Sequence, residues 1–269
     1  MSAVEIPAAL VKQLRETTGA GMMECKRALQ ETGGDIDAAV TLLREKGMAQ
    51  AAKRADRATT EGLVGYRIRD GVGTIVAIGC ETEPVSNNEE FQEFGKRVLE
   101  AVERGGPEAI DALEEERAEL SARLGENIVV QGARFEAGDG EVLAGYVHPP
   151  ANKKGVLVKL KGGDEQLGRF LAMHVSFGEP SWKTRDEVPA EAVDAERQIY
   201  LNSDELEGKP EQAREKIVEG MLGKRFFAAT PGGVLVDQAW IHDASKSVGQ
   251  ALGEAGAELV EFAYFSVAG

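Results

Sequence analysis

Glu81 and Glu83 are two acidic residues that lie two positions apart, and such a pair could serve as an acid and a base. They lie in CETEPVSNNEEF, which runs from residue 80 to residue 91. Because one carboxyl group can donate a proton while a second accepts one, a hydrolase that uses Glu81 or Glu83 is one function open to the chain. Within a loop, however, this spacing often arises by chance. The pair alone does not predict an enzyme.

Other residues that attack substrates or bind metals are scattered along the chain. The two cysteines, Cys25 and Cys80, form no CxxC pair, and no serine or cysteine lies in a local nucleophile motif. The three histidines stand apart from one another: His148, His174 and His242. The sequence also lacks the glycine-rich GxxxxGKS/T and GxGxxG patterns of nucleotide-binding loops. We expect no catalytic residue, no metal site and no cofactor, and we interpret the thiols and imidazoles as structural.

The 269 residues carry a formal net charge of −15. This charge argues against nucleic acid as a direct partner, because a protein that binds the phosphate backbone needs a positive surface. The most basic stretch, 44–57, holds five basic and two acidic residues, and we interpret it as a solvated helical linker. No apolar run approaches the roughly 18 residues of a membrane span. Residues 1–10 lack the basic start of a signal peptide, so we expect a protein of the cytoplasm with no membrane partner.

Residues 7–46 have the pattern of three short helices. Pro7 suits a first helical turn, and Gly19 is a typical residue to end that helix. Asp35 is a good N-cap for the third helix, which we expect to end before Gly47. A unit of about 45 residues buries only a small core, so it leaves apolar surface for a partner.

Two adjacent methionines, Met22 and Met23, begin the second of these helices, which is expected over 22–32. Neighbouring residues on a helix point about 100° apart, so both side chains cannot face the same core. At least one is therefore expected to be exposed, where a flexible and polarizable side chain suits an adaptable contact. The alternative is that both wrap the edge of a small core.

From residue 60 onward the pattern changes to two cycles of strands and helices. The first cycle predicts strands at 61–69, 73–80 and 127–135, a helix at 88–103 and a charged helical stretch up to 124. The second predicts strands at 141–148, 155–161 and 258–267 and helices at 165–176 and 245–253. Since both cycles have the order strand, strand, helix, strand, the sequence predicts an α+β fold with two subdomains of similar plan.

An inserted segment interrupts the second cycle. Its seam positions alternate steps of four and three, as in a coiled coil: Val188, Ala192, Ala195, Ile199, Asn202 and Leu206. The Gly-Lys-Pro at 208–210 ends this helix, and a second helix carries Ala213, Ile217 and Met221. The segment is therefore expected to be an antiparallel helical hairpin.

Five strings in this sequence resemble segments of bacterial elongation factor Ts. They are TGAGMMECKRAL (18–29), GDIDAAVTLLREKG (34–47), KRADRATTEGLV (53–64), GKPEQAREKIVEG (208–220) and SKSVGQAL (245–252). The resemblance extends over nearly the whole chain. It implies a ubiquitin-associated-like domain of three helices with a basic linker, two core subdomains with small antiparallel sheets, and a coiled-coil hairpin inserted in the second. The corresponding ranges are 1–56, 57–140, 141–185 with 229–269, and 186–228.

The resemblance also implies a function, which is guanine-nucleotide exchange on elongation factor Tu during translation elongation. By similarity, Arg15, Met22 and Met23 contact the nucleotide-binding domain of that partner, and His148 contacts the partner elsewhere. An exchange factor of this kind is not an enzyme, because it changes no covalent bond.

In the family, a strand end with the residues Thr-Asp-Phe-Val intrudes near the partner's nucleotide site and helps to dislodge Mg²⁺. Here Thr82, Glu83, Pro84 and Val85 stand at those positions. Proline replaces the aromatic wedge, and it offers less area but a stiffer backbone. Two alternatives stay open: that these residues are dispensable for exchange, or that the chain is an adaptor that binds a partner without affecting its nucleotide.

Overall fold

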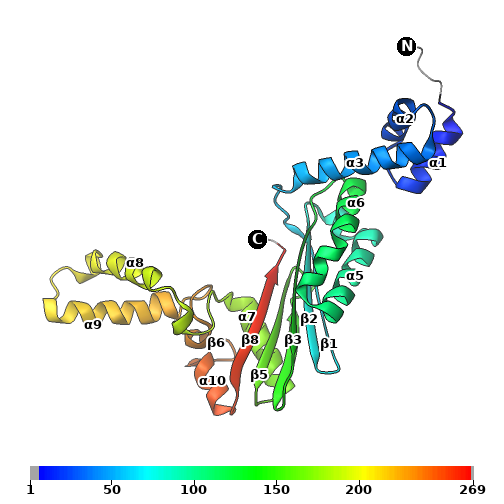
Figure 1. Ribbon diagram of the computed structural model, residues 1–269. Coiled ribbons are helices and arrows are strands. Elements are labelled where there is room, and N and C mark those ends of the chain that lie inside the picture. The colour runs from blue at the N-terminus through cyan, green and yellow to red at the C-terminus, as the bar shows by residue number, and fades with distance from the viewer. Residues whose placement is uncertain (1–5, 268–269) are drawn as a thin grey trace. The chain divides into compact units, whose positions relative to one another are not determined.

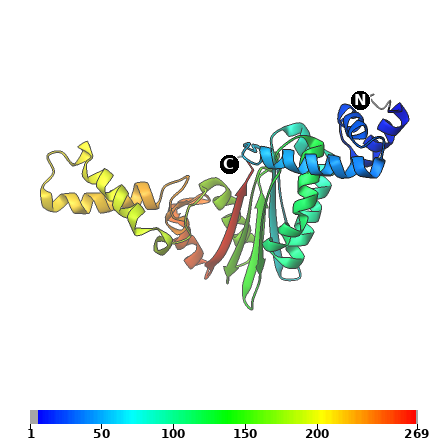
Figure 2. The ribbon, with the colours of Figure 1, turned by 45° about the horizontal axis from the view of Figure 1, so that its top comes forward.

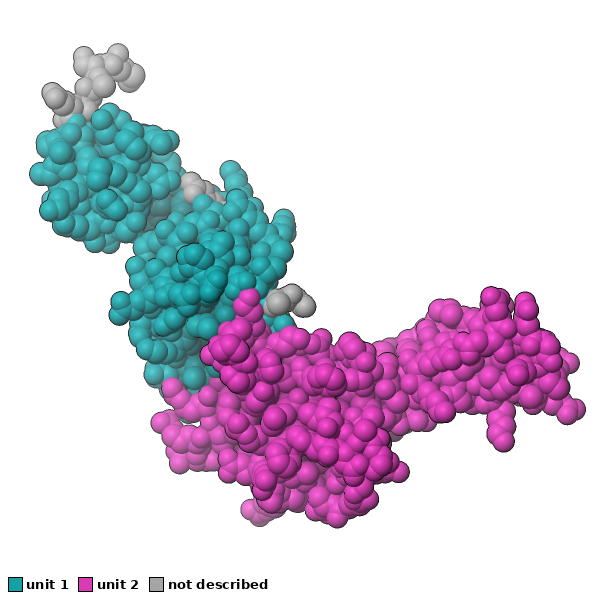
Figure 3. All heavy atoms as spheres, turned by 180° about the vertical axis from the view of Figure 1, so that it is seen from behind, with its two compact units in different colours: residues 1–65, 76–133, 266–269 teal, residues 66–75, 134–265 magenta. Residues whose placement is uncertain are grey.

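The computed structural model describes residues 6–267, apart from the side chains of two residues within the third helix. Contacts divide the chain into two compact units, which Figure 3 colours separately. Unit 1 contains residues 1–65, 76–133 and 266–269, and unit 2 contains residues 66–75 and 134–265. The first five residues, on which the prediction about a signal peptide partly rests, lie outside the described residues. Over residues 6–267, no helix combines the length and the apolar character needed to cross a membrane.

Three helices form the N-terminal part of unit 1 (Figure 1), as predicted. They are α1 (Ala8–Thr18), α2 (Met22–Glu31) and α3 (Ile36–Arg54). Gly19 follows α1 with a φ of 67°, a left-handed conformation that favours glycine. The Asp35 carboxylate caps α3 by accepting a hydrogen bond from the N–H of Ala38 at 3.0 Å. The helices share one small core of Val11, Leu14, Cys25, Ala28, Leu29 and Ala39.

The prediction that α3 ends before Gly47 is wrong, because the helix passes through this residue. The glycine serves close packing instead: a Cβ atom at Gly47 would lie 2.8 Å from the Cβ of Ala122 in α6 (Glu114–Leu124). Arg44, one turn earlier, also pairs with a carboxylate of α6 at 3.1 Å. The basic stretch is thus helical over most of its length, as expected, but its first turns pack against α6 and are not simply solvated.

The Gly47→Ala variant is expected to lower the free energy of unfolding by about 1–2 kcal/mol. The added methyl group overpacks the contact with Ala122, which outweighs the gain in helix propensity. Gly220→Ala is the matched control in α9 (Glu211–Met221), where an added Cβ meets no atom within 4 Å. It should stabilise the protein by about 0.5–1 kcal/mol. Urea unfolding followed by circular dichroism measures both changes, and effects of the same sign would contradict close packing at Gly47.

The first cycle forms a three-stranded sheet in the order β1-β2-β3, with helices on one face (Figure 2). Its elements are β1 (Glu61–Arg69), β2 (Val72–Cys80), α4 (Glu83–Ser86), α5 (Glu89–Gly105), the 3-10 helix η1 (Pro107–Leu113), α6 and β3 (Val129–Glu136). In unit 1, Val76 and Ile78 of β2 pack against Phe91 and Phe94 of α5. Asn88 caps α5, since its Oδ1 accepts a hydrogen bond from Glu90 N at 2.8 Å. The predicted strands and helices of this cycle are confirmed, and the short helix α4 is an addition.

The second cycle forms a sheet in the order β4-β5-β8. Its elements are β4 (Glu141–Val147), β5 (Lys154–Lys161), α7 (Glu165–Gly178), η5 (Leu235–Asp237), β6 (Ala239–Trp240), β7 (Asp243–Ser247), α10 (Val248–Glu254) and β8 (Glu258–Ser266). Strands β4 and β5 are antiparallel, with Glu141 opposite Lys161. Leu171 of α7 and Val248 of α10 lie in the core of this unit. The last helix begins three residues later than predicted, because residues 243–247 pair with β6.

The inserted segment is a helical hairpin, as predicted, and α8 and α9 lie side by side in Figures 1 and 2. Its elements are η2 (Arg185–Glu187), α8 (Ala190–Leu201), η3 (Asp204–Leu206), α9 and the π-helical turn η4 (Leu222–Phe227). Tyr200 of α8 and Val218 of α9 are buried between the two helices. Ile217 and Met221 of α9 face the same cluster, in agreement with the sequence pattern.

The predicted seam of α8, by contrast, is wrong in phase. Ile199 is 62% exposed and Ala195 is also exposed, whereas Tyr200 is buried. The helix ends at Leu201, so the last two positions of the predicted seam lie beyond it, with Leu206 buried in η3. The tyrosine ring offers more apolar area than isoleucine, and a shift of one residue turns the inward face by about 100°.

Candidate functional site

The tip, defined as Thr82 to Val85, is a single helical turn between β2 and α5. Thr82 is its N-cap residue, and the Thr82 carbonyl oxygen accepts a hydrogen bond from the N–H of Val85 at 3.2 Å. Pro84 lies in the first turn, where its missing N–H removes no helical hydrogen bond. Thr82, Glu83 and Pro84 are exposed, whereas Val85 is partly buried against the core beneath α5. The turn therefore exposes an acid and a rigid ring next to a partly buried valine that anchors it.

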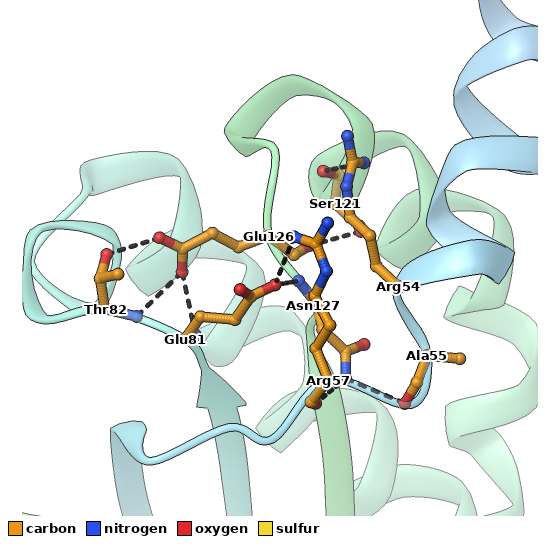
Figure 4. A network of polar contacts seen from close by, with 8 residues as sticks. All are labelled: Arg54, Ala55, Arg57, Glu81, Thr82, Ser121, Glu126 and Asn127. Carbon is orange, nitrogen blue, oxygen red and sulfur yellow. Dashed lines mark hydrogen bonds and ion pairs between the residues drawn. The ribbon is translucent and has the colours of Figure 1, made fainter.

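Glu126 holds the start of the tip (Figure 4). Its Oε2 accepts hydrogen bonds from the backbone N–H groups of Glu81 (2.9 Å) and Thr82 (3.0 Å), and its Oε1 accepts one from the Thr82 hydroxyl (2.5 Å). Since β2 ends at Cys80, both N–H groups lie beyond the strand. Hydrogen bonds to a charged acceptor are stronger than those between neutral groups. One carboxylate thus orders the backbone that leads into the tip.

Glu81 and Asn127 complete this network. The Asn127 N–H donates to Glu81 Oε1 at 2.7 Å, and the Arg57 guanidinium lies 3.4 Å from the same oxygen. The buried Asn127 side-chain amide donates to the carbonyl oxygens of Ala55 (3.1 Å) and Arg57 (2.8 Å). The base of the tip is therefore tied to the chain that follows α3. Glu81, the carboxylate considered above for hydrolysis, acts in this network as a hydrogen-bond acceptor.

Both adjacent methionines are exposed, Met22 over 55% and Met23 over 60% of their surface. They begin α2, while the inward face of that helix is formed by Cys25, Ala28 and Leu29. The prediction that at least one is exposed is confirmed, and the alternative that both wrap the core is wrong. Arg15 of α1 is exposed as well. Unit 1 thus carries two separate groups of predicted contact residues, one on the helices and one at the tip.

Comparison with known proteins identifies the family. The sequence model described as Elongation factor TS matches residues 81–269. Elongation factor Ts of Halorhodospira halophila is 42% identical over 98% of this chain and 92% of its own length. Proteins of the same name from Idiomarina loihiensis and Pectobacterium carotovorum are 41% identical, over 97% and 98% of this chain and 91% and 92% of theirs. The chain belongs to the elongation factor Ts family. It therefore has a role in translation elongation.

In this member of the elongation factor Ts family, His148 is exposed directly after β4 in unit 2. Its Nδ1 lies 2.9 Å from the hydroxyl oxygen of Tyr146, and its backbone N–H donates to the Lys154 carbonyl at 2.9 Å. The Arg169 guanidinium lies over the Tyr146 ring, 5.9 Å from its centre. These contacts give the imidazole a defined orientation at the surface of this unit.

Three residues important for the arrangement of this chain were not predicted from the sequence: Glu126, Asn127 and Gln238. The buried Gln238 amide donates to the carbonyl oxygens of Gly178 and Ala229, both at 2.9 Å, and to that of Gly232. Its Oε1 lies 3.0 Å from Nε2 of His174. All three residues bind the backbone of segments distant in the chain. For Glu126 and Asn127, the local sequence gives one indication: the two polar residues lie between a glycine that ends a helix and an apolar strand.

His174 is buried and satisfied, as expected for an isolated histidine. Its Nε2 donates to Gln238, while its Nδ1 accepts the N–H of Ile241 at 3.3 Å and its ring stacks on Trp240. Burial lowers the pKa of His174, the hydrogen bond to Gln238 opposes this shift, and the charge of His242 adds to it. Cys25 and Cys80 are buried thiols, as predicted.

This lowered pKa predicts a loss of stability at acidic pH. The unfolded histidine takes up a proton near its ordinary pKa of about 6.5, whereas the folded one resists protonation, so the unfolded state binds more protons. The contribution of His174 is therefore present above about pH 6.5 and is lost as the pH falls through the folded pKa. The free energy of unfolding, measured by urea titration, should fall between pH 7.5 and pH 5.5. The slope contributed by His174 should stay below about 1.4 kcal/mol per pH unit. An equal slope in His174→Gln would assign the effect to other groups.

Proposed function

We propose that this chain is a guanine-nucleotide exchange factor that promotes GDP release from elongation factor Tu in the cytoplasm. The observation that carries the proposal is the tip: an exposed Glu83–Pro84 pair on a helical turn that is hydrogen-bonded at its base and anchored by Val85. This turn occupies the place that the family resemblance assigns to the intruding residues. A short, stiff projection suits insertion into a neighbouring protein.

The mechanism needs no covalent chemistry. Mg²⁺ in a nucleotide site demands near-ideal octahedral oxygen geometry and links the phosphates to the protein. When the tip displaces one loop that carries a ligand, both the metal ion and the nucleotide are held less tightly. Glu83 supplies a polar contact in this displacement, and Pro84 supplies a blunt wedge in place of an aromatic ring.

Contacts away from the tip supply binding energy. We assign Arg15, Met22 and Met23 to the nucleotide-binding domain of the partner from the family resemblance, and the exposure of all three side chains on the first two helices supports this assignment. Flexible methionines adapt to a partner surface at low steric cost. We assign His148 to a second contact on the partner. In this proposal residues 1–56 form the binding domain, 57–140 and 141–185 with 229–269 the core, and 186–228 the hairpin.

Binding of the factor and binding of GDP oppose each other in this scheme. Linkage requires that the factor weakens GDP binding by the same ratio by which GDP weakens binding of the factor. Each factor of ten corresponds to about 1.4 kcal/mol of coupling. The factor therefore accelerates release without determining which nucleotide binds next.

Stopped-flow release of a fluorescent GDP analogue from elongation factor Tu of the same organism tests the proposal. The release rate should rise with the concentration of this protein and then saturate. Binding without any change in the release rate would favour the adaptor alternative. Turnover of a substrate by the isolated protein would favour a hydrolase and contradict the proposal.

A further inference from the structure

Three residues, Glu81, Glu126 and Asn127, form what we call the clamp at the base of the tip (Figure 4). Glu126 accepts three hydrogen bonds from the backbone and hydroxyl of the segment that enters the tip, at 2.5–3.0 Å. Asn127 donates its backbone N–H back to Glu81 at 2.7 Å. The two neighbours in sequence therefore hold the strand end at two kinds of group, its backbone N–H groups and the Glu81 side chain.

The other end of the tip is held independently. Asn88 caps α5 directly after the tip, with Glu90 N–H donating at 2.8 Å and Phe91 N–H at 3.3 Å to its Oδ1. Val85 packs into the core beneath this helix. Between these two anchors, the side chains of Glu83 and Pro84 are exposed. The turn is therefore suited to contact a partner. The orientation of its first residues depends on Glu126.

We propose that Glu126 is a positioning residue for nucleotide exchange: it orients the tip by binding the N–H groups of Glu81 and Thr82. This inference rests on the proposed function and names a residue that acts through the tip. A proline wedge has less contact area than an aromatic one, and its ring fixes the backbone angle φ. The effect of such a small and rigid wedge therefore depends more on its position. Misplacement of an acting group by about 1 Å can cost on the order of a hundredfold in rate.

Within unit 1, the clamp is joined to the chain that leads from the three helices. Glu126 follows α6, the helix on which α3 packs through Gly47 and Ala122. Asn127 holds the carbonyl oxygens of Ala55 and Arg57, directly after α3. Glu126 thus holds the tip, whereas its neighbour Asn127 holds the end of the helical segment, so a change in Glu126 is expected to loosen the tip more than it changes the partner contact of the methionines.

Three variants of the full chain test this inference. Glu126→Ala removes all three acceptor contacts. Glu126→Gln is the conservative variant, since its carbonyl oxygen can accept both N–H groups and its amide can donate to the Thr82 hydroxyl. Asp111→Ala is the matched control, because Asp111 is an exposed acid of η1 in the same unit. Circular dichroism establishes that each variant is folded, and Glu126→Gln keeps the test available if the alanine variant is not.

The first readout is amide hydrogen exchange of the isolated protein at Glu81 and Thr82, measured by NMR. Exchange should accelerate at least about tenfold in Glu126→Ala, equivalent to about 1.4 kcal/mol of protection. Glu126→Gln should stay within about threefold of the native chain, and Asp111→Ala should be unchanged. Slow exchange that persists in Glu126→Ala would overturn the inference whatever the activity of the protein.

The second readout is stimulated GDP release from elongation factor Tu. Glu126→Ala should lower the maximal rate about three- to tenfold, with less than a twofold change in the half-saturating concentration, and Glu126→Gln should restore it. In a double-mutant cycle, Glu126→Ala should cause no further loss once Glu83 and Pro84 have been replaced by alanine and glycine. Full additivity, or a change confined to half-saturation, would overturn the positioning role. A tip variant with native activity would instead overturn the proposed function of the tip.

Discussion

Replacing Glu83 by alanine together with Pro84 by glycine is expected to lower the maximal rate of stimulated GDP release at least about tenfold. Each factor of ten corresponds to about 1.4 kcal/mol in the barrier. The double variant removes the two exposed side chains of the tip and gives the turn the freedom of glycine, so it loses both the polar contact and the stiff wedge. Stopped-flow measurements over a range of factor concentrations separate the maximal rate from half-saturation.

The half-saturating concentration should change less than about threefold, because the binding energy is assigned to Arg15, Met22 and Met23. A matched control exists in the same unit: Pro107 and Glu108 are an exposed proline–acid pair at the start of η1. Pro107→Gly with Glu108→Ala should leave the release rate unchanged. An unchanged rate in the tip variant would show that the helices and core perform exchange without the tip.

The largest expected loss of stability follows Gln238→Ala, which should cost about 3 kcal/mol or more. Gln238 is fully buried. Its amide nitrogen donates hydrogen bonds to carbonyl oxygens at the end of α7 and after the hairpin, and its oxygen accepts one from His174. Truncation leaves Nε2 of the buried His174 without its partner, at about 1–3 kcal/mol, and removes a donor from the partly buried carbonyl oxygens of Ala229 and Gly232. It also leaves a cavity at the junction of these segments.

Tryptophan fluorescence during urea unfolding measures this effect, because both tryptophans, Trp182 and Trp240, lie in unit 2 with Gln238. Gln198→Ala is the control. Gln198 is exposed on α8, so its truncation should change the free energy of unfolding by less than about 0.5 kcal/mol. Similar midpoints for the two variants would mean that Gln238 does not hold these segments together.

The sequence alone determined much of the local structure and the family resemblance. Gly19 and Asp35 mark helix ends by their own conformational preferences, and Met22 with Met23 predicts an exposed methionine from helix geometry alone. The alternating strands and the α+β class were predicted for the same reason, since these patterns depend on residues a few positions apart. The strings that resemble elongation factor Ts are likewise contiguous.

Only the tertiary structure decided what those same residues contact across the chain. Gly47 has the appearance of a helix stop, yet its role depends on Ala122, which approaches it from another helix. The phase of α8 depends on the partner face that Tyr200 meets. Glu126 binds backbone 44 and 45 residues away, and Gln238 reaches His174 across 64 residues. A carboxylate or an amide carries no local mark of the distant N–H or carbonyl group it will bind, because folding brings the two together.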